Sequence, residues 1–269
     1  MNEYWTLFGP PLVAAAAVIL ACFIAMWLIS LAMKDSSIVD IFWGPGCALG
    51  GWVAFFVASG GTTRTTIVLV LATLWAARIG WYIGKRNWGA EDRRYARLRK
   101  HVEDQGKSYV WYSLQHVFLY QGAMMWLASL PIMFAVIYKT PAELGAVAWL
   151  GVATIVVGLI IETVADNQMS AFRAGPRQPG EVMDRGLWRY SRHPNYFGEM
   201  MIQWGFFLIA CDQPIGLITF VGPLVLSYNI IGPLGAALLE RRLLKKNPGY
   251  ADYIARTSKF IPWPPKAKA

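Results

Sequence analysis

The side chains in this sequence that could do chemistry include three ionisable residues in or beside one apolar stretch. Glu162, Asp166 and Arg173 are spaced so that they share one face of a helix. Hydrocarbon excludes such groups unless they are paired or hydrated, so ionisable residues at this depth indicate a functional site. We therefore predict a polar binding face here, with snorkelling to the membrane interface as the alternative, above all for Arg173.

A second polar cluster lies between residues 186 and 199, in the segment GLWRYSRHPNYFGE. Pro194 fits the first turn of a helix, where its missing N–H costs nothing, and Asn195 and Glu199 then face the same way. Three further side chains lie at or just before this helix start: Arg189, Arg192 and His193. A helix N-terminus among such groups favours anions such as phosphate. Anchoring to lipid headgroups is the structural alternative.

A third group follows the last apolar stretch of the chain. It consists of Glu240 and Arg241, with Tyr253 a little further along. Alone, this would be an ordinary polar end of a helix. If all three groups lie on the same face of a membrane, we expect this one to form a third wall of a shared pocket.

The composition requires membrane-spanning helices to position these residues. The 269 residues are 56% hydrophobic and only 15% charged, whereas soluble domains are about 25% charged. Seven apolar stretches have about the length needed to cross hydrocarbon: residues 10–33, 41–59, 65–84, 111–138, 143–166, 196–211 and 214–239. We predict an all-α integral membrane protein with about seven transmembrane helices.

The orientation follows from the distribution of lysine and arginine. These residues concentrate in segments 85–107, 173–192 and 241–268 and are rare in the other connections. The positive-inside rule therefore places the three segments in the cytosol, the N-terminus outside and the C-terminus inside. The net charge of +9 follows from this topology and from contact with anionic lipid, without nucleic acid as a partner.

The connections between these stretches differ in character, and none of them divides the chain into domains. Residues 85–108 are predicted to form a surface helix, and residues 174–194, with their Gly and Pro, an irregular loop. The tail 240–263 should contain two short helices around a turn at residues 247–249. We expect a single polytopic domain over residues 1–269.

Metal and common nucleotide motifs are not indicated. Cys22, Cys47 and Cys211 show no metal-ligand spacing, and the three histidines are scattered, so no metal is expected. The sequence also lacks a Walker loop and a GxGxxG turn, so that any nucleotide would need another binding mode.

Several segments resemble the membrane steroid 5α-reductase superfamily, most closely its bacterial members. They are RYSRHPNYFGE (189–199), the Glu240-Arg241 pair and the tyrosine-containing tail that ends in Ile261-Pro262. Weaker support comes from SIVDIFWG (37–44) and NWGAEDRRY (87–95). The Arg-His-Pro core also occurs in isoprenylcysteine carboxyl methyltransferases and related phospholipid methyltransferases.

The resemblance implies a seven-helix fold that holds NADPH in a polar cavity open to the cytosol. Residues 143–263 would form the cofactor-binding half and the N-terminal half the substrate side, in a multi-pass protein of the bacterial inner membrane. The implied reaction is hydride transfer to an α,β-unsaturated 3-oxosteroid or a similar enone lipid that enters from the bilayer. By position, the implied cofactor contacts are Glu162, Asp166, Arg173, His193, Asn195, Glu199, Glu240, Arg241 and Tyr253.

Asp40 is the implied catalytic residue. Hydride addition to an enone builds negative charge on the carbonyl oxygen, which a positioned acid must stabilise. Reductases of the family use a carboxyl group of the second span with a tyrosine of the third, and Asp40 occupies the corresponding end of the second span. Near hydrocarbon a carboxyl group could stay protonated and donate. Tyr82 in the third span matches no motif of the family, and a helix cap is the alternative role for Asp40.

Three functions remain open from the sequence. The leading hypothesis is an NADPH-dependent enone reductase, favoured by Asn195 after His-Pro and by the face that carries Glu162, Asp166 and Arg173. The second is an S-adenosylmethionine-dependent methyltransferase acting on a lipid or prenyl thiol. The third is a sterol- or lipid-binding scaffold without enzymatic activity, which would not need so many ionisable groups. The natural substrate and the oligomeric state do not follow from the sequence.

Overall fold

The structure of the protein is a computed structural model that describes residues 2–87, 89, 91–176, 178, 180–232 and 235–266. Within these residues every regular element is a helix and none is a strand, in agreement with the predicted all-α class. They pack into two compact units: unit 1 is Met1–Ala148 with Ile209–Gly222, and unit 2 is Trp149–Leu208 with Pro223–Ala269. The expectation of one domain with a substrate half and a cofactor half stays a prediction.

Apolar helices dominate the structure, as expected for an integral membrane protein. By length and composition, five helical segments could cross a membrane: Glu3–Met33, Thr63–Asn87, Tyr109–Ile137, Ala146–Ala174 and Pro214–Lys245, of which the last includes two residues outside the described ones. The other two predicted spans coincide with a shorter apolar helix, Trp43–Ala58, and with the 17-residue helix Pro194–Ala210. How many of these helices cross the bilayer, predicted as seven, stays a prediction.

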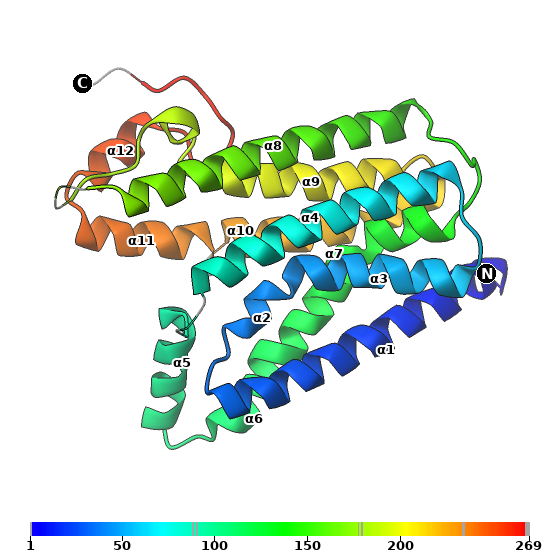
Figure 1. Ribbon diagram of the computed structural model, residues 1–269, viewed down its shortest axis with the longest axis horizontal. Helices are drawn as coiled ribbons and strands as arrows, with labels where there is room; N and C mark the ends of the chain where they lie inside the picture. The colour runs from blue at the N-terminus through cyan, green and yellow to red at the C-terminus, as the bar shows by residue number, and fades with distance from the viewer. Residues whose placement is uncertain are drawn as a thin grey trace. The chain divides into compact units, whose positions relative to one another are not determined.

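Unit 1 is built around helix α3, which packs against α1, α4 and α7 (Figure 1). Its elements are α1 (Asn2–Met33), α2 (Ile38–Ile41), α3 (Trp43–Ala58), α4 (Thr63–Asn87), α5 (Arg93–Asp104), α6 (Tyr109–Ser113), the π-helical η1 (Leu114–Leu119), α7 (Tyr120–Ile137) and the 3₁₀ helix η3 (Pro214–Phe220). Glycines on α3 permit the close contact, because a Cβ on Gly51 would lie 2.7 Å from Ile132 Cγ2 of α7. This packing places α2 and the start of α3 beside the polar connection that contains α5.

A buried ion pair between Arg64 and Asp212 links the connections between helices at one end of unit 1. Asp212 also accepts a hydrogen bond from the Gly145 N–H at 2.7 Å, and the Arg64 guanidinium donates to the Glu143 carbonyl at 3.4 Å. The pair therefore ties the start of α4 to the loop before residue 146 and to the turn after residue 210. Charge pairing, in addition to apolar packing, holds these connections together.

Unit 2 contains α8 and α9 side by side with their backbones in contact (Figure 1). Its elements are α8 (Ala146–Ala174), the 3₁₀ helix η2 (Gly186–Arg189), α9 (Pro194–Ala210), α10 (Val221–Ile231), α11 (Ala236–Lys246) and α12 (Tyr250–Arg256). A Cβ on Gly198 would lie 2.7 Å from the Gly158 oxygen, and one on Gly205 would lie 2.8 Å from the Gly151 oxygen. The two helices are thus antiparallel, and their small residues bring the polar side chains near Gly198 close to α8.

The predicted character of the connections is confirmed within the described residues. The charged segment 85–108 contains α5, and the described part of the loop 174–194 contains the short η2. The tail forms α11 and α12 on either side of a turn near residues 247–249. Residues 88 and 90 of the NWGAEDRRY segment lie outside the described residues.

Candidate functional site

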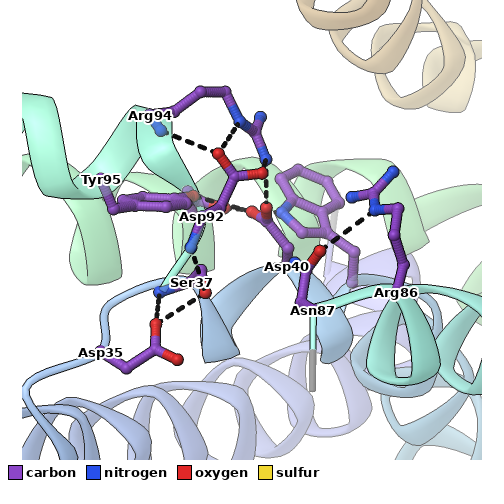
Figure 2. Close-up of polar contacts among 10 residues, drawn as sticks. Asp35, Ser37, Asp40, Arg86, Asn87, Asp92, Arg94 and Tyr95 are labelled. Atoms are coloured by element: carbon purple, nitrogen blue, oxygen red, sulfur yellow. Dashed lines mark hydrogen bonds and ion pairs between the residues drawn. The ribbon is translucent and has the colours of Figure 1, made fainter. Parts of the chain in front are cut away.

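Asp40 lies in α2 at the centre of a hydrogen-bonded cluster in unit 1, between Arg94 and Tyr95 (Figure 2). Its Oδ2 accepts a bond from Arg94 Nη2 at 2.6 Å, and its Oδ1 accepts one from the Tyr95 hydroxyl at 2.7 Å. Both partners are side chains of α5 rather than backbone N–H groups at a helix start. The helix-cap alternative for Asp40 is therefore wrong, and its partners indicate a functional role or a role in holding α5.

The helix cap in this region is Asp92, which begins α5. Its side chain accepts a bond from the Arg94 N–H at 2.8 Å. The preceding Glu91 accepts from the Ser36 N–H at 2.9 Å and from Arg99 Nη2 at 2.8 Å. These bonds fix the start of α5 against the turn between α1 and α2, and so they place Tyr95 beside Asp40 (Figure 2).

Two further residues orient the Tyr95 hydroxyl. Gln121 Nε2 donates to this hydroxyl at 3.1 Å, and Trp43 Nε1 donates to Gln121 Oε1 at 2.7 Å. Because an indole can only donate, Trp43 fixes the Gln121 amide with its NH₂ group toward Tyr95. Gln121 follows the π-helical η1, a distortion that is frequent at functional sites. The Tyr95 hydroxyl therefore accepts from Gln121 and donates to Asp40.

The electrostatics of this Asp40 cluster (Asp40, Trp43, Arg94, Tyr95 and Gln121) keep the phenol protonated. Burial, reinforced by the neighbouring Asp40, raises the pKa of Tyr95 well above 10. Burial acts to lower the pKa of Arg94, but Asp40 and Asp92 outweigh it and raise that pKa. At neutral pH the cluster therefore offers a neutral phenol as proton donor, supported by a carboxylate whose charge Arg94 compensates.

Four of the predicted cofactor residues come together in unit 2, on α8 and α9. Asn195 Nδ2 donates to Asp166 Oδ1 at 3.1 Å. Glu162 is also close to α9, because its backbone nitrogen lies 2.8 Å from the Cβ position of Gly198, next to Glu199. The side chains of Glu162, Asp166 and Glu199 are buried. We call Glu162, Asp166, Asn195 and Glu199 the α8–α9 polar row.

Two other predicted cofactor residues, His193 and Glu240, lie in a second buried cluster of unit 2. Glu240 Oε1 accepts from Arg192 Nε at 2.8 Å and lies 2.9 Å from His193 Nε2. Arg192 Nη1 also donates to the carbonyl oxygens of Thr257 at 2.6 Å and Ile254 at 3.1 Å. This Arg192–Glu240 cluster joins the start of α9 to α11 and to the end of α12. The N–H donors of Arg192 are directed at Glu240 and at the two backbone carbonyls.

Tyr253 belongs to the same region of the tail. Its hydroxyl is buried and donates to the Trp188 carbonyl at 2.5 Å, while Trp188 Nε1 donates to the Ala165 carbonyl at 3.0 Å. Burial raises the pKa of Tyr253 above its ordinary value. The tail is thus attached to η2 and, through Trp188, to α8.

The remaining predicted cofactor residues, Arg173 and Arg241, are exposed, as is Arg189. The structure does not bring them into the buried row or into the Arg192–Glu240 cluster. Phosphate binding by these arginines would therefore take place at the surface of unit 2. Among the described residues, no group of three or more His, Cys, Asp or Glu side chains could hold a metal ion.

Three residues of interest were missed by sequence reasoning. Tyr95 carries no signal of its own, although it lies in a segment that contributes to the family resemblance. Gln121 and Gln203 do carry a signal, since each is an amide side chain within an apolar helix. A long-range partner such as Tyr95 can be identified only once the fold brings α5 to α2.

Comparisons with known proteins connect the chain to a family without assigning an activity. An uncharacterized protein of Schizosaccharomyces pombe, C594.04c, is 25% identical over 267 residues, which cover 88% of this chain and 75% of the yeast protein. No solved structure matches the chain. The family model described as "Protein of unknown function (DUF1295)" matches residues 26–257. Since this match covers most of its length, the chain belongs to the DUF1295 family.

Proposed function

We propose that this protein is an NADPH-dependent reductase of an enone lipid, with 3-oxo-Δ4-steroids as the first substrates to test. The observation that carries the proposal is the position of the Tyr95 hydroxyl: the residue is buried, and its hydroxyl is held between Gln121 and Asp40. A phenol in this setting suits a carbonyl oxygen on which negative charge develops. The family resemblance of the sequence supports the same reaction class.

In the proposed reaction the acid is Tyr95, and Asp40 positions it. Bound NADPH would supply a hydride for the β-carbon of the enone. The Tyr95 hydroxyl, which can rotate, would turn its hydrogen from Asp40 to the carbonyl oxygen and stabilise the resulting enolate. Asp40 would keep its ion pair with Arg94 during this step, so that its charge stays compensated. The hydride donor would leave as NADP⁺, and a proton taken up from solvent water at the α-carbon would complete the reduction.

The donors and acceptors of unit 2 fit a dinucleotide. The α8–α9 polar row offers buried carboxylates and one amide, which suit ribose hydroxyls and a carboxamide. The exposed arginines 173, 189 and 241 suit phosphates. Arg192 is not assigned to a phosphate, because its donors are directed at Glu240 and at backbone carbonyls. The proposal thus assigns the cofactor to unit 2.

The test of this assignment is dinucleotide binding to purified full-length protein. Asn195→Ala and Glu199→Ala should each weaken NADPH binding by up to about a hundredfold, since a lost hydrogen bond costs roughly 0.5–3 kcal/mol. Quenching of protein fluorescence by NADPH measures the affinity.

Asn229→Ala is the matched control for these two variants. Asn229 is also an asparagine of unit 2, but its amide donates to the Val225 carbonyl within α10 at 2.9 Å. Its replacement should leave NADPH affinity unchanged. Binding of S-adenosylmethionine in place of NADPH by the unmodified protein would refute the reductase proposal and favour a methyltransferase.

The proposed reductase would lie in the inner membrane of a bacterium, with seven spans and its C-terminus in the cytosol. A cysteine at position 143 should then react with an impermeant maleimide in intact cells, and one at position 100 only after permeabilisation. Both side chains, Glu143 and Lys100, are exposed, and Cys22, Cys47 and Cys211 are first replaced. The reverse labelling pattern would contradict the orientation.

A further inference from the structure

Gln203 is a buried amide that lacks a hydrogen-bond partner among the residues that the structure describes. It lies in the apolar helix α9 and is only 1% exposed. Neither its Oε1 nor its Nε2 is hydrogen-bonded within this part of the chain. A buried amide without partners is costly, and a polar side chain in an apolar membrane helix commonly marks a functional position. Within the described residues, no side-chain hydrogen bond of Gln203 therefore contributes to holding unit 2 together.

The position of Gln203 continues the polar row of α9. Asn195, Glu199 and Gln203 follow one another at intervals of four residues, so each is rotated by only about 40° from the one before. With a rise of about 1.5 Å per residue, Gln203 lies roughly 12 Å along the helix from Asn195. Asn195, paired with Asp166, is at the polar start of α9, and Gln203 is within the apolar part. The row therefore extends from a charged end to a single deep amide.

The chemistry of an amide restricts what could satisfy it. Its oxygen accepts and its NH₂ group donates, so a single ligand group that satisfies both ends must itself donate and accept. Another carboxamide does this through two reciprocal N–H···O bonds. A ketone or a carboxylate would pair with the NH₂ group and leave the Gln203 oxygen unsatisfied.

We propose that Gln203 is the nicotinamide-recognition residue of unit 2, pairing through both of its polar ends with the carboxamide of the dinucleotide. This inference rests on the proposed function. The nicotinamide is one end of the dinucleotide and the only part of it with a carboxamide. Gln203 lies within the apolar part of α9, which suits the uncharged carboxamide of the nicotinamide. The charged diphosphate would remain near the polar start of α9.

The experiment compares two oxidised dinucleotides by calorimetry on the full-length protein in detergent. They are NADP⁺ and its 3-acetylpyridine analogue, in which a methyl group replaces the NH₂ of the carboxamide. The unmodified protein should prefer NADP⁺ by about 5- to 30-fold, because the analogue leaves the Gln203 oxygen without a donor. In Gln203→Leu this preference should disappear, and NADP⁺ affinity should fall by about 10- to 100-fold.

One control variant and one alternative test variant separate a local effect of Gln203 from a general loss of folding. Gln168→Met removes another glutamine of unit 2, whose Oε1 accepts from the Leu187 N–H at 3.0 Å, and it should leave the preference unchanged. Gln203→Met, nearly isosteric, repeats the test if Gln203→Leu fails to fold. Since Gln203 lacks partners in the described structure, both Gln203 variants should melt, without dinucleotide, at or above the temperature of the unmodified protein.

The outcomes also distinguish this inference from the proposed function. A Gln203 variant that keeps the full preference for NADP⁺ would overturn the inference, as would an unmodified protein that binds both dinucleotides equally. In both of those cases dinucleotide binding itself would stand. If the unmodified protein binds neither compound, the proposed function fails and the role of Gln203 fails with it.

Discussion

Replacing Tyr95 with phenylalanine is expected to lower the turnover of a 3-oxo-Δ4-steroid such as progesterone by about 100- to 1,000-fold, the usual effect of removing one oxyanion donor. The ring would still fill its buried position, while the hydroxyl that lies between Gln121 and Asp40 would be lost. NADPH affinity should be unchanged, because the cofactor is assigned to unit 2. Steady-state oxidation of NADPH with the steroid present, together with cofactor binding, measures both quantities.

Tyr109→Phe is the matched control for this variant. Tyr109 is likewise buried in unit 1, and its hydroxyl donates to Ser36 Oγ at 2.9 Å without touching Asp40. Loss of the Tyr109 hydroxyl should lower the free energy of unfolding by about 0.5–1.5 kcal/mol, the net contribution of one hydrogen bond, and should leave turnover close to normal. Equal loss of turnover in both variants would indicate a general loosening of unit 1 and count against Tyr95 as the acid.

Asp40→Asn distinguishes the acid from the residue that positions it. If Tyr95 is the acid, the asparagine can still accept the Tyr95 hydroxyl bond, and turnover should fall less than in Tyr95→Phe. If instead Asp40 donates directly, as the sequence suggested, Asp40→Asn should lose two to three powers of ten and Tyr95→Phe much less. Comparing the two variants therefore assigns the proton donor.

Much of the fold could be predicted because the length and apolar composition of a local segment are enough to identify a membrane helix. Within the described residues, each predicted apolar stretch coincides with one helix or with consecutive helices, and the turn in the tail also follows from local chemistry. The apolar span was predicted to end at residue 166, and α8 continues beyond it to Ala174, as the predicted helix face of Glu162, Asp166 and Arg173 requires. The extension carries Arg173 out to an exposed position, where its charge is solvated.

The candidate site was predictable only where spacing along one helix determines which side chains lie on the same face. The row on α8 and α9 follows from intervals of four residues, and the structure does pair Asp166 with Asn195. The partner of Asp40 could not be found in this way, because Tyr95 is 55 residues distant in sequence and reaches it through the packing of α5. Likewise, nothing local shows that the donors of Arg192 are used by Glu240 and by backbone carbonyls.

The Arg192–Glu240 cluster leads to an expected result on stability. Glu240→Ala should lower the free energy of unfolding by about 3–5 kcal/mol, because it leaves the buried Arg192 guanidinium without its carboxylate. The effect should be present in the absence of NADPH, since the contacts of Glu240 are made within unit 2. Thermal or denaturant unfolding of the purified protein in detergent measures it.

Arg241→Ala is the control, because Arg241 is the next residue of the same helix and is exposed. Its replacement should change stability by less than about 0.5 kcal/mol. The alternative suggested by the sequence is that Glu240 contacts the cofactor directly. In that case Glu240→Ala would unfold like the unmodified protein without NADPH and lose only the stabilisation that NADPH adds. The comparison of the two variants with and without NADPH therefore decides whether Glu240 holds the tail or the cofactor.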